Sequence, residues 1–171
     1  PKSVSSEQVS RYAKWLLGVN LVIGRKGLAA QRNFITSWYP NGQHILNMDD
    51  DIRQVMRLHV ARANPRDRRY WRLSPITGLN SVGTTPGLKK SNLDEIIQSG
   101  FKKAVDAGAY LWGIYPVDNA YFMQPNSSTR LKFIVGPMFG IINRPELAKD
   151  LDITMDEKED MERTLRYWRQ D

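Results

Sequence analysis

One stretch of sequence decides the fold: Gln43-His-Ile-Leu-Asn-Met48, followed directly by Asp49-Asp50-Asp51. The first six residues are predicted to form a buried strand, so the three acids stand at the carboxyl end of that strand. Upstream, Asn20-Leu-Val-Ile23 predicts another short strand, and Leu28 to Trp38 predicts a helix that ends at Pro40-Asn41-Gly42. This alternation indicates an α/β fold, in which a parallel sheet is covered by helices and ligands bind at the carboxyl ends of the strands.

The same alternation extends toward both ends of the chain. Apolar spacing and capping patterns predict the remaining elements, which are a helix over 5–17, a helix from about 92 to 107, a strand over 110–115, a strand region over 131–142 and a last helix from about Met155, behind the capping box Thr154-x-x-Glu157. Residues 61–90 are rich in Arg, Pro, Gly, Ser and Thr, and we expect a long surface loop there with little regular structure.

The composition is that of a soluble globular protein. The chain has 171 residues, 41% of them hydrophobic and 25% charged, which predicts one domain. It has no cysteine, so disulfides and thiolate metal sites are excluded. No apolar run approaches the roughly 20 residues that a membrane-spanning helix needs, and Pro1-Lys2-Ser3-Val4 lacks the pattern of a signal peptide. We therefore expect no membrane segment and a cytoplasmic location.

Positive charge is concentrated in one stretch of the chain. The formal net charge is +7, and the arginines of this stretch are Arg53, Arg57, Arg62, Arg66, Arg68, Arg69 and Arg72. Such a segment attracts nucleic acid, phosphate groups or an acidic glycan, and Tyr70 and Trp71 beside the arginines are able to stack on a base. The alternative is a solvated arginine-rich face without a partner.

The triplet Asp49-Asp50-Asp51 is the strongest local signal for chemistry. Because strand residues alternate between faces, Asp49 and Asp51 are expected to point the same way. Two carboxylates at a strand end suit a hard divalent ion such as Mn²⁺ or Mg²⁺, which would bridge the phosphates of a nucleotide sugar. The alternative is an acidic turn that caps the next helix. Three acids directly after a buried strand are electrostatically costly without a cation, which favours the metal.

Two weaker signals accompany the triplet. Gly27 and the small residues after it allow a phosphate or ribose to approach a helix N-terminus, and Arg32 is able to pair with phosphate or with the acidic triplet. A plain amphipathic helix explains the same residues. Glu159-Asp160 places a carboxylate that could accept a proton from an acceptor hydroxyl, or else forms a solvated acidic first turn of a helix. Trp112 is either an acceptor-side aromatic or a core residue.

Together these pieces resemble the GT-A fold glycosyltransferases. The first half of the resemblance lies in Gly27-x-x-x-x-Arg32-Asn33 and Ile45-Leu-Asn-Met-Asp-Asp-Asp51, and the second half in Phe133-Ile-Val-Gly-Pro-Met-Phe-Gly140 and Glu159-Asp160. The resemblance implies a Rossmann-like mixed sheet with helices on both faces, lacking its first strand. It also implies that residues 1–171 are a single catalytic domain, truncated at both ends.

The resemblance implies a function and a set of site residues. The function is metal-dependent transfer of a sugar from a nucleotide diphosphate sugar, expected to be a UDP-sugar, onto a hydroxyl. The residues implied are Asp49 and Asp51 as metal ligands, Gly27, Arg32, Asn33 and Asp50 for the donor, and Asp160 or Glu159 as the catalytic base.

A narrower resemblance is to the TET/JBP-associated glycosyltransferases. It is carried by Val22 to Phe34, Asn47-Met-Asp-Asp-Asp-Ile52, Trp112 to Asn119 and Glu159 to Arg166. That group includes the base J glucosyltransferases and phage or viral relatives that add sugar to hydroxymethylated DNA bases. It implies DNA as the acceptor, facing Arg53–Arg72, and the host cytoplasm for a viral or phage protein. A glycan or protein glycosyltransferase of the same fold and a non-catalytic nucleic-acid-binding domain are the alternatives.

Overall fold

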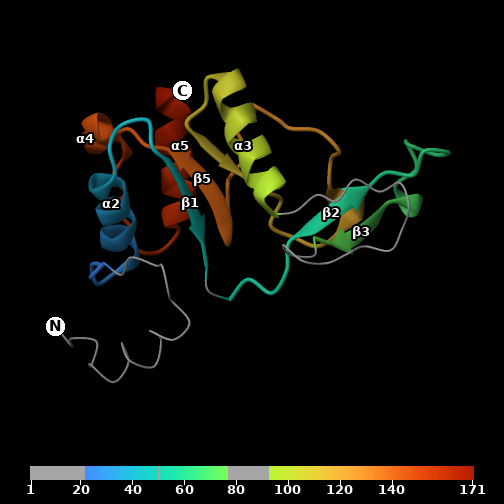
Figure 1. The fold of residues 1–171 in the computed structure, drawn as a ribbon, viewed down its shortest axis with the longest axis horizontal. Coiled ribbons are helices and arrows are strands. Elements are labelled where there is room, and N and C mark those ends of the chain that lie inside the picture. The colour runs from blue at the N-terminus through green and yellow to red at the C-terminus, as the bar shows by residue number, and fades with distance from the viewer. Residues whose placement is uncertain (1–21, 50, 77–92) are drawn as a thin grey trace.

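The computed structural model describes residues 22–49, 51–76 and 93–171, and this part of the chain is mixed α/β (Figure 1). Its elements are α2 (Leu28–Trp38), β1 (His44–Met48), β2 (Met56–His59), the 3₁₀ turn η1 (Arg68–Tyr70), β3 (Arg72–Pro75), α3 (Leu93–Ala107), β4 (Leu111–Gly113), the 3₁₀ turn η2 (Ala120–Phe122), β5 (Met138–Ile142), the 3₁₀ turn η3 (Pro145–Leu147), α4 (Ala148–Leu151) and α5 (Glu159–Gln170). The helix expected over residues 5–17 lies outside the described residues, as do Asp50 and residues 77–92.

The central sheet is antiparallel, which corrects the parallel sheet expected from the sequence. Its strands follow the order β1-β5-β4, and β5 pairs antiparallel with both neighbours. β1 and β4 consequently run in the same direction, as strands joined through a helix should, but the later strand β5 lies between them. A helix–strand alternation along the chain does not reveal such an insertion. The Rossmann-like GT-A arrangement therefore stays an expectation.

Helices cover both faces of this sheet (Figure 1). On one face the strand side chains pack against α4 and α5, and the buried cluster consists of Ile45, Leu111, Phe139, Ile141, Leu151 and Tyr167. On the other face Ile142 packs against Phe101 and Ala104 of α3. Trp112 lies on this second face, and a Cβ added to Gly140 would collide with its indole. Trp112 is therefore a packing residue, and not the acceptor-side aromatic that we considered.

A β-hairpin replaces part of the irregular loop expected over residues 61–90. β2 and β3 pair antiparallel, with Leu58 opposite Leu73 and Arg57 opposite Ser74. The alternation of apolar with basic or polar residues in both strands is the pattern of a half-exposed strand, but the high arginine content concealed it. Trp71, between η1 and β3, is only 6% exposed. In Figure 1 the hairpin lies at the opposite end of the molecule from α2 and α4.

Two predicted boundaries also change. Only Met138–Ile142 of the region 131–142 is a strand, and the last helix begins at Glu159 and not near Met155. The expected capping box at Thr154 and Glu157 does not form, because the helix starts only after Lys158. The backbone of Lys158 has the left-handed conformation (φ 61°). None of the described helices has the length and apolar character that a membrane crossing needs.

Candidate functional site

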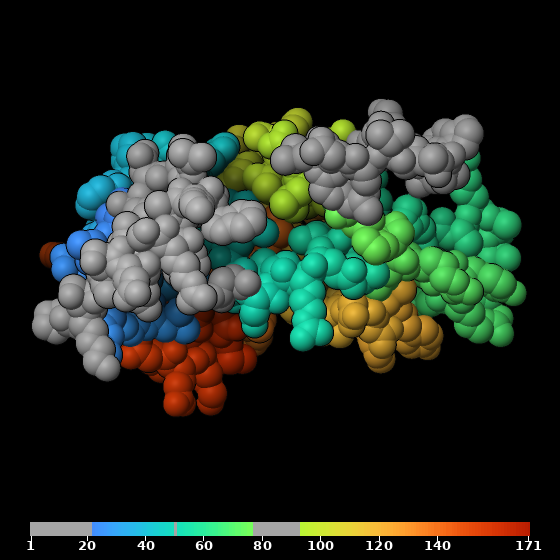
Figure 2. All heavy atoms as spheres, turned by 60° about the horizontal axis from the view of Figure 1, so that its bottom comes forward, coloured from blue at the N-terminus to red at the C-terminus, as the bar shows by residue number. Residues whose placement is uncertain are grey.

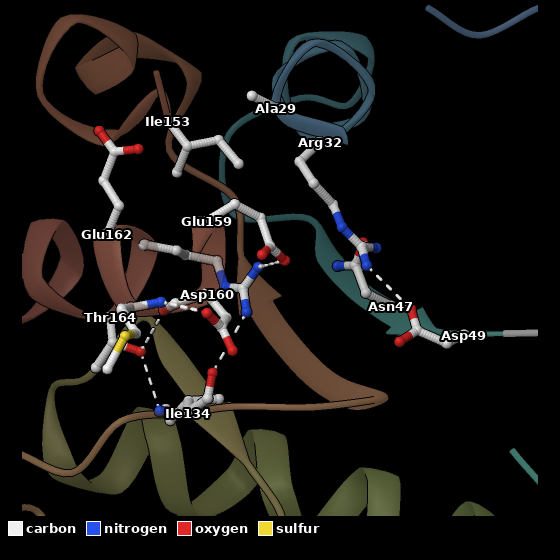
Figure 3. A network of polar contacts seen from close by, with 12 residues as sticks. Ala29, Arg32, Asn47, Asp49, Ile134, Ile153, Glu159, Asp160, Glu162 and Thr164 are labelled. Carbon is white, nitrogen blue, oxygen red and sulfur yellow. Dashed lines mark hydrogen bonds and ion pairs between the residues drawn. The ribbon is translucent and has the colours of Figure 1, made fainter. Parts of the chain in front are cut away.

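Arg32 of α2 joins the helix to the end of β1. Because strand side chains alternate, Asn47 and Asp49 point to the same face as Ile45, and that face lies under α2. Arg32 donates from Nη1 to Asn47 Oδ1 over 3.0 Å and from Nη2 to Asp49 Oδ1 over 3.0 Å. Figure 3 shows the arginine reaching across from its helix to both residues. The predicted pairing of Arg32 with the acidic triplet is thus present in the structure.

The predicted metal ligands and the predicted base line a single cleft. The cleft has a volume of about 420 Å³ and is lined by Leu28, Arg32, Asp49, Asp51, Val135, Gly136, Glu159 and Asp160. Asp49 comes from the end of β1, where its backbone N–H donates to Pro137 O over 2.9 Å. Glu159 and Asp160 come from the first turn of α5 (Figure 3). Carboxylates from distant parts of the chain therefore face one space beside one guanidinium.

Arg163 holds one of the two acids of α5 that line the cleft. Its Nη1 lies 3.5 Å from Glu159 Oε1, and its side chain is only 4% exposed. The guanidinium carbon lies 3.7 Å from the centroid of the Phe139 ring. Burial lowers the pKa of Arg163, and the negative charge of Glu159 opposes that shift. Asp160 has no ion pair with another described residue, so it is the less constrained carboxylate.

A second cavity, which we call the inner cavity because many of its lining residues are buried, shares Arg32 with the cleft. It measures about 300 Å³ and is lined in part by Asn47, Phe139, Asn143 and Arg163. Several buried N–H groups of the described residues that line this cavity have no hydrogen-bond partner, namely Arg32 Nε, Asn47 Nδ2 and Arg163 Nε. Unsatisfied guanidinium donors suit the oxygen atoms of an anionic group such as phosphate.

Asp156 lies at the N-terminus of α2, where the sequence predicted a phosphate or ribose beside Gly27. Its Oδ1 accepts a hydrogen bond from Ala29 N over 2.9 Å. Gly27 has a positive φ of 98°, and a Cβ there would lie 3.3 Å from the same carboxylate oxygen. The N-terminus of α2 is therefore capped by Asp156, which lies far along the chain. A phosphate of a nucleotide sugar would have to displace the Asp156 carboxylate to bind there.

Asn33 does not lie where we expected it, in contact with a nucleotide sugar. Its Nδ2 donates to Ile153 O over 2.8 Å, and its Oδ1 accepts from Ile153 N over 3.0 Å. The side chain thereby joins α2 to the segment between α4 and α5. It borders the inner cavity and not the cleft.

The oxygen donors of the cleft match the preference of a hard divalent ion, but they do not complete a metal site. Asp49 and Asp51 supply carboxylates, and Asp49 is already paired with Arg32. Among the described residues, which exclude Asp50, no group of three or more His, Asp or Glu side chains is arranged to hold a metal. Further ligands would have to come from donor phosphates, water or Asp50.

No protein-family model, curated protein or solved structure matches this chain. The resemblance to GT-A glycosyltransferases consequently rests on the residues quoted for it.

Sequence reasoning missed two residues that shape the site. Arg163 lies four positions after Glu159, a spacing at which helix side chains meet, so its pairing was recognisable. Asp156 caps a helix 127 residues earlier in the chain, and no local pattern indicates that contact.

Proposed function

We propose that the cleft transfers a sugar from a nucleotide diphosphate sugar, a UDP-sugar in the simplest case, onto a hydroxyl. One observation carries this proposal: Asp49 and Asp51 line the same cleft as Glu159 and Asp160. Metal-dependent sugar transfer that inverts the sugar uses this combination, because the first two acids would serve the leaving diphosphate and one acid of the second pair the attacking hydroxyl.

In this proposal each residue has a separate task. Asp49 and Asp51 would hold Mn²⁺ or Mg²⁺, and a bound ion would neutralise charge on the leaving diphosphate. Arg32 bonds to Asp49, and in this proposal it would contact the phosphates beside that carboxylate. Asp160 accepts the proton of the acceptor hydroxyl, and Glu159 remains paired with Arg163.

The acceptor in this proposal is a hydroxymethylated base in DNA, bound through Arg53–Arg72. The support is the charge of the hairpin, and a glycan or a protein is the alternative acceptor. A non-catalytic nucleic-acid-binding domain is favoured by a separate observation, since Asp49 is already neutralised by Arg32. In that case the acids would only complete an internal ion-pair network.

Calorimetry with Mn²⁺ and UDP separates the enzyme from the binding domain. Asp51 is exposed, so Asp51→Asn should leave the thermal stability unchanged. We expect it to weaken binding of Mn²⁺–UDP at least about tenfold, because a carboxylate ligand is lost. The matched control is Asp118→Asn, at an exposed acid that does not line the cleft. Unchanged Mn²⁺–UDP affinity in Asp51→Asn, or no binding by the parent protein, would overturn the proposal.

A further inference from the structure

The hairpin end of the molecule carries exposed aromatic side chains that sugar transfer does not use. Tyr70 is 50% exposed, Tyr121 56% and Phe122 61%. The rings of Tyr121 and Phe122 meet edge to face, with centroids 5.3 Å apart. We call Tyr70, Tyr121 and Phe122 the aromatic platform. Large apolar side chains gathered on a surface cost hydration free energy unless a partner covers them, so such a patch marks a contact site.

Arg68 fastens the two halves of the platform together. Its Nη1 donates to Tyr121 O over 2.9 Å, which ties η2 to η1. Its guanidinium carbon lies 5.9 Å from the Tyr121 ring centroid and 5.5 Å from that of the buried Trp71. The platform is therefore held before any partner arrives, which reduces the entropy that binding must remove.

The surroundings of the platform are strongly basic. Residues 53–76 contain seven arginines and one acid, Asp67, a net charge of +6 (seven minus one). Asp67 is already paired, because its Oδ2 lies 2.7 Å from Arg69 Nη2. Within the described residues, the arginines that form no ion pair include Arg53, Arg57, Arg62 and Arg66. In Figure 2 the green hairpin and the gold segment around residue 120 form one continuous surface. The partner that this charge selects is a polyanion.

We propose that the aromatic platform binds unpaired bases of a single-stranded nucleic acid, whose phosphates lie along the arginines of the hairpin. Aromatic faces stack on any unpaired base, and a basic surface follows the backbone. A duplex would use only the arginines, because its bases are stacked on one another. The inference deepens the proposed contact of Arg53–Arg72 with nucleic acid, but the binding requires neither a nucleotide sugar nor a metal.

Fluorescence anisotropy with labelled 15-residue oligonucleotides tests this inference. The probes are oligo(dT), oligo(rU) and a duplex DNA of the same length, without divalent ions or nucleotide sugar. The variant is Tyr121→Ala with Phe122→Ala, and both side chains are more than half exposed, so the fold should persist in a thermal melt. Tyr121→Phe keeps the ring. The matched control is Tyr39→Ala, an exposed tyrosine that follows α2 at the other end of the molecule (Figure 1).

We expect the double variant to bind oligo(dT) at least about fivefold more weakly, since the stacking of bases on the two removed rings is lost. The dependence on salt should stay the same because no charge is removed. Tyr121→Phe and Tyr39→Ala should bind like the parent protein, and oligo(rU) should behave like oligo(dT). Parent-like oligo(dT) binding by the double variant would overturn the inference. An equal loss of duplex DNA binding in the double variant would also overturn it. Absence of oligonucleotide binding by the parent protein at low salt would overturn it as well and would assign the platform to a protein partner. A flat calorimetric response to Mn²⁺–UDP would instead refute only the sugar transfer.

Discussion

Glu159 and Asp160 are neighbours in sequence, but different contacts hold them. Glu159 lies 3.5 Å from the buried Arg163, so removing the negative charge of Glu159 would leave the buried guanidinium without its partner. Among the described residues, the side chain of Asp160 accepts a hydrogen bond only from its neighbour Met161, whose backbone N lies 2.7 Å from Asp160 Oδ1. An asparagine at position 160 keeps an acceptor oxygen for that bond. The proton-accepting role therefore fits Asp160, whereas Glu159 contributes to the stability of the α5–β5 contact.

Asp160→Asn should lower kcat about 100-fold or more while the affinity for Mn²⁺–UDP changes little, because a base acts in the transition state. Sugar transfer and calorimetry on the same preparation measure the two quantities. Asp118→Asn is again the control and should behave like the parent protein. If Asp160→Asn transfers sugar at the parent rate, Asp160 is not the base.

At the scale of elements, Glu162 fixes how the chain enters α5. Its carboxylate accepts hydrogen bonds from Thr154 N over 2.8 Å and Met155 N over 3.0 Å, and from Arg166 Nη2 over 2.7 Å. Burial alone would raise its pKa, but the hydrogen bonds from Thr154, Arg166 and Met155 outweigh burial and lower the pKa from 4.5 to about 2. This carboxylate holds the segment before α5 in the way that the expected capping box would have done.

The lowered pKa of Glu162 predicts a specific acid dependence of stability. The stabilisation is fully present above the unfolded pKa of 4.5 and is lost as the pH falls toward the folded pKa of about 2. Glu162→Gln should reduce the free energy of unfolding at pH 7 by about 2–3 kcal/mol, since charged hydrogen bonds are lost. Urea unfolding at about pH 7, 5 and 3 measures both effects.

Between about pH 5 and pH 3, the parent protein should lose more stability than Glu162→Gln does. The exposed Glu157→Gln is the matched control and should follow the parent curve. Parallel curves for the parent and Glu162→Gln would show that Glu162 is not ionised in this network.

At the scale of the whole molecule, the acidic cleft and the basic hairpin stand on different parts of the fold. The cleft lies where α2, the end of β1 and the start of α5 meet, and the hairpin lies at the opposite end from α2 (Figure 1). The carboxylates of the cleft are thereby separated from the arginines of the hairpin.

Arg62 and Arg66 are the arginines that best test this separation. Both are exposed, whereas Arg68 and Arg69 are tied to Tyr121 and Asp67. Replacing Arg62 and Arg66 with alanine should weaken duplex DNA binding and reduce the slope of log K against log salt by up to about one unit per arginine. Arg169→Ala, at an exposed position on α5, is the control. An unchanged affinity and slope in the double variant would show that the hairpin does not face DNA.

The sequence by itself determined the elements whose signals are local. Apolar spacing and terminating residues predicted α2 over 28–38, which the structure has at Leu28–Trp38, and a strand that ends directly before Asp49. The helix expected near 92–107 is present as Leu93–Ala107. Each of these is set by neighbours within a few positions, so a single sequence contains the information.

Only the tertiary structure decided what depends on contacts between distant segments. The insertion of β5 between β1 and β4 made the sheet antiparallel, and the pairing of β2 with β3 turned an expected loop into a hairpin. The approach of α5 to the end of β1 brought Asp160 into the same cleft as Asp51. These contacts depend on how buried faces meet, and strand order and helix approach are set by packing that no local pattern records.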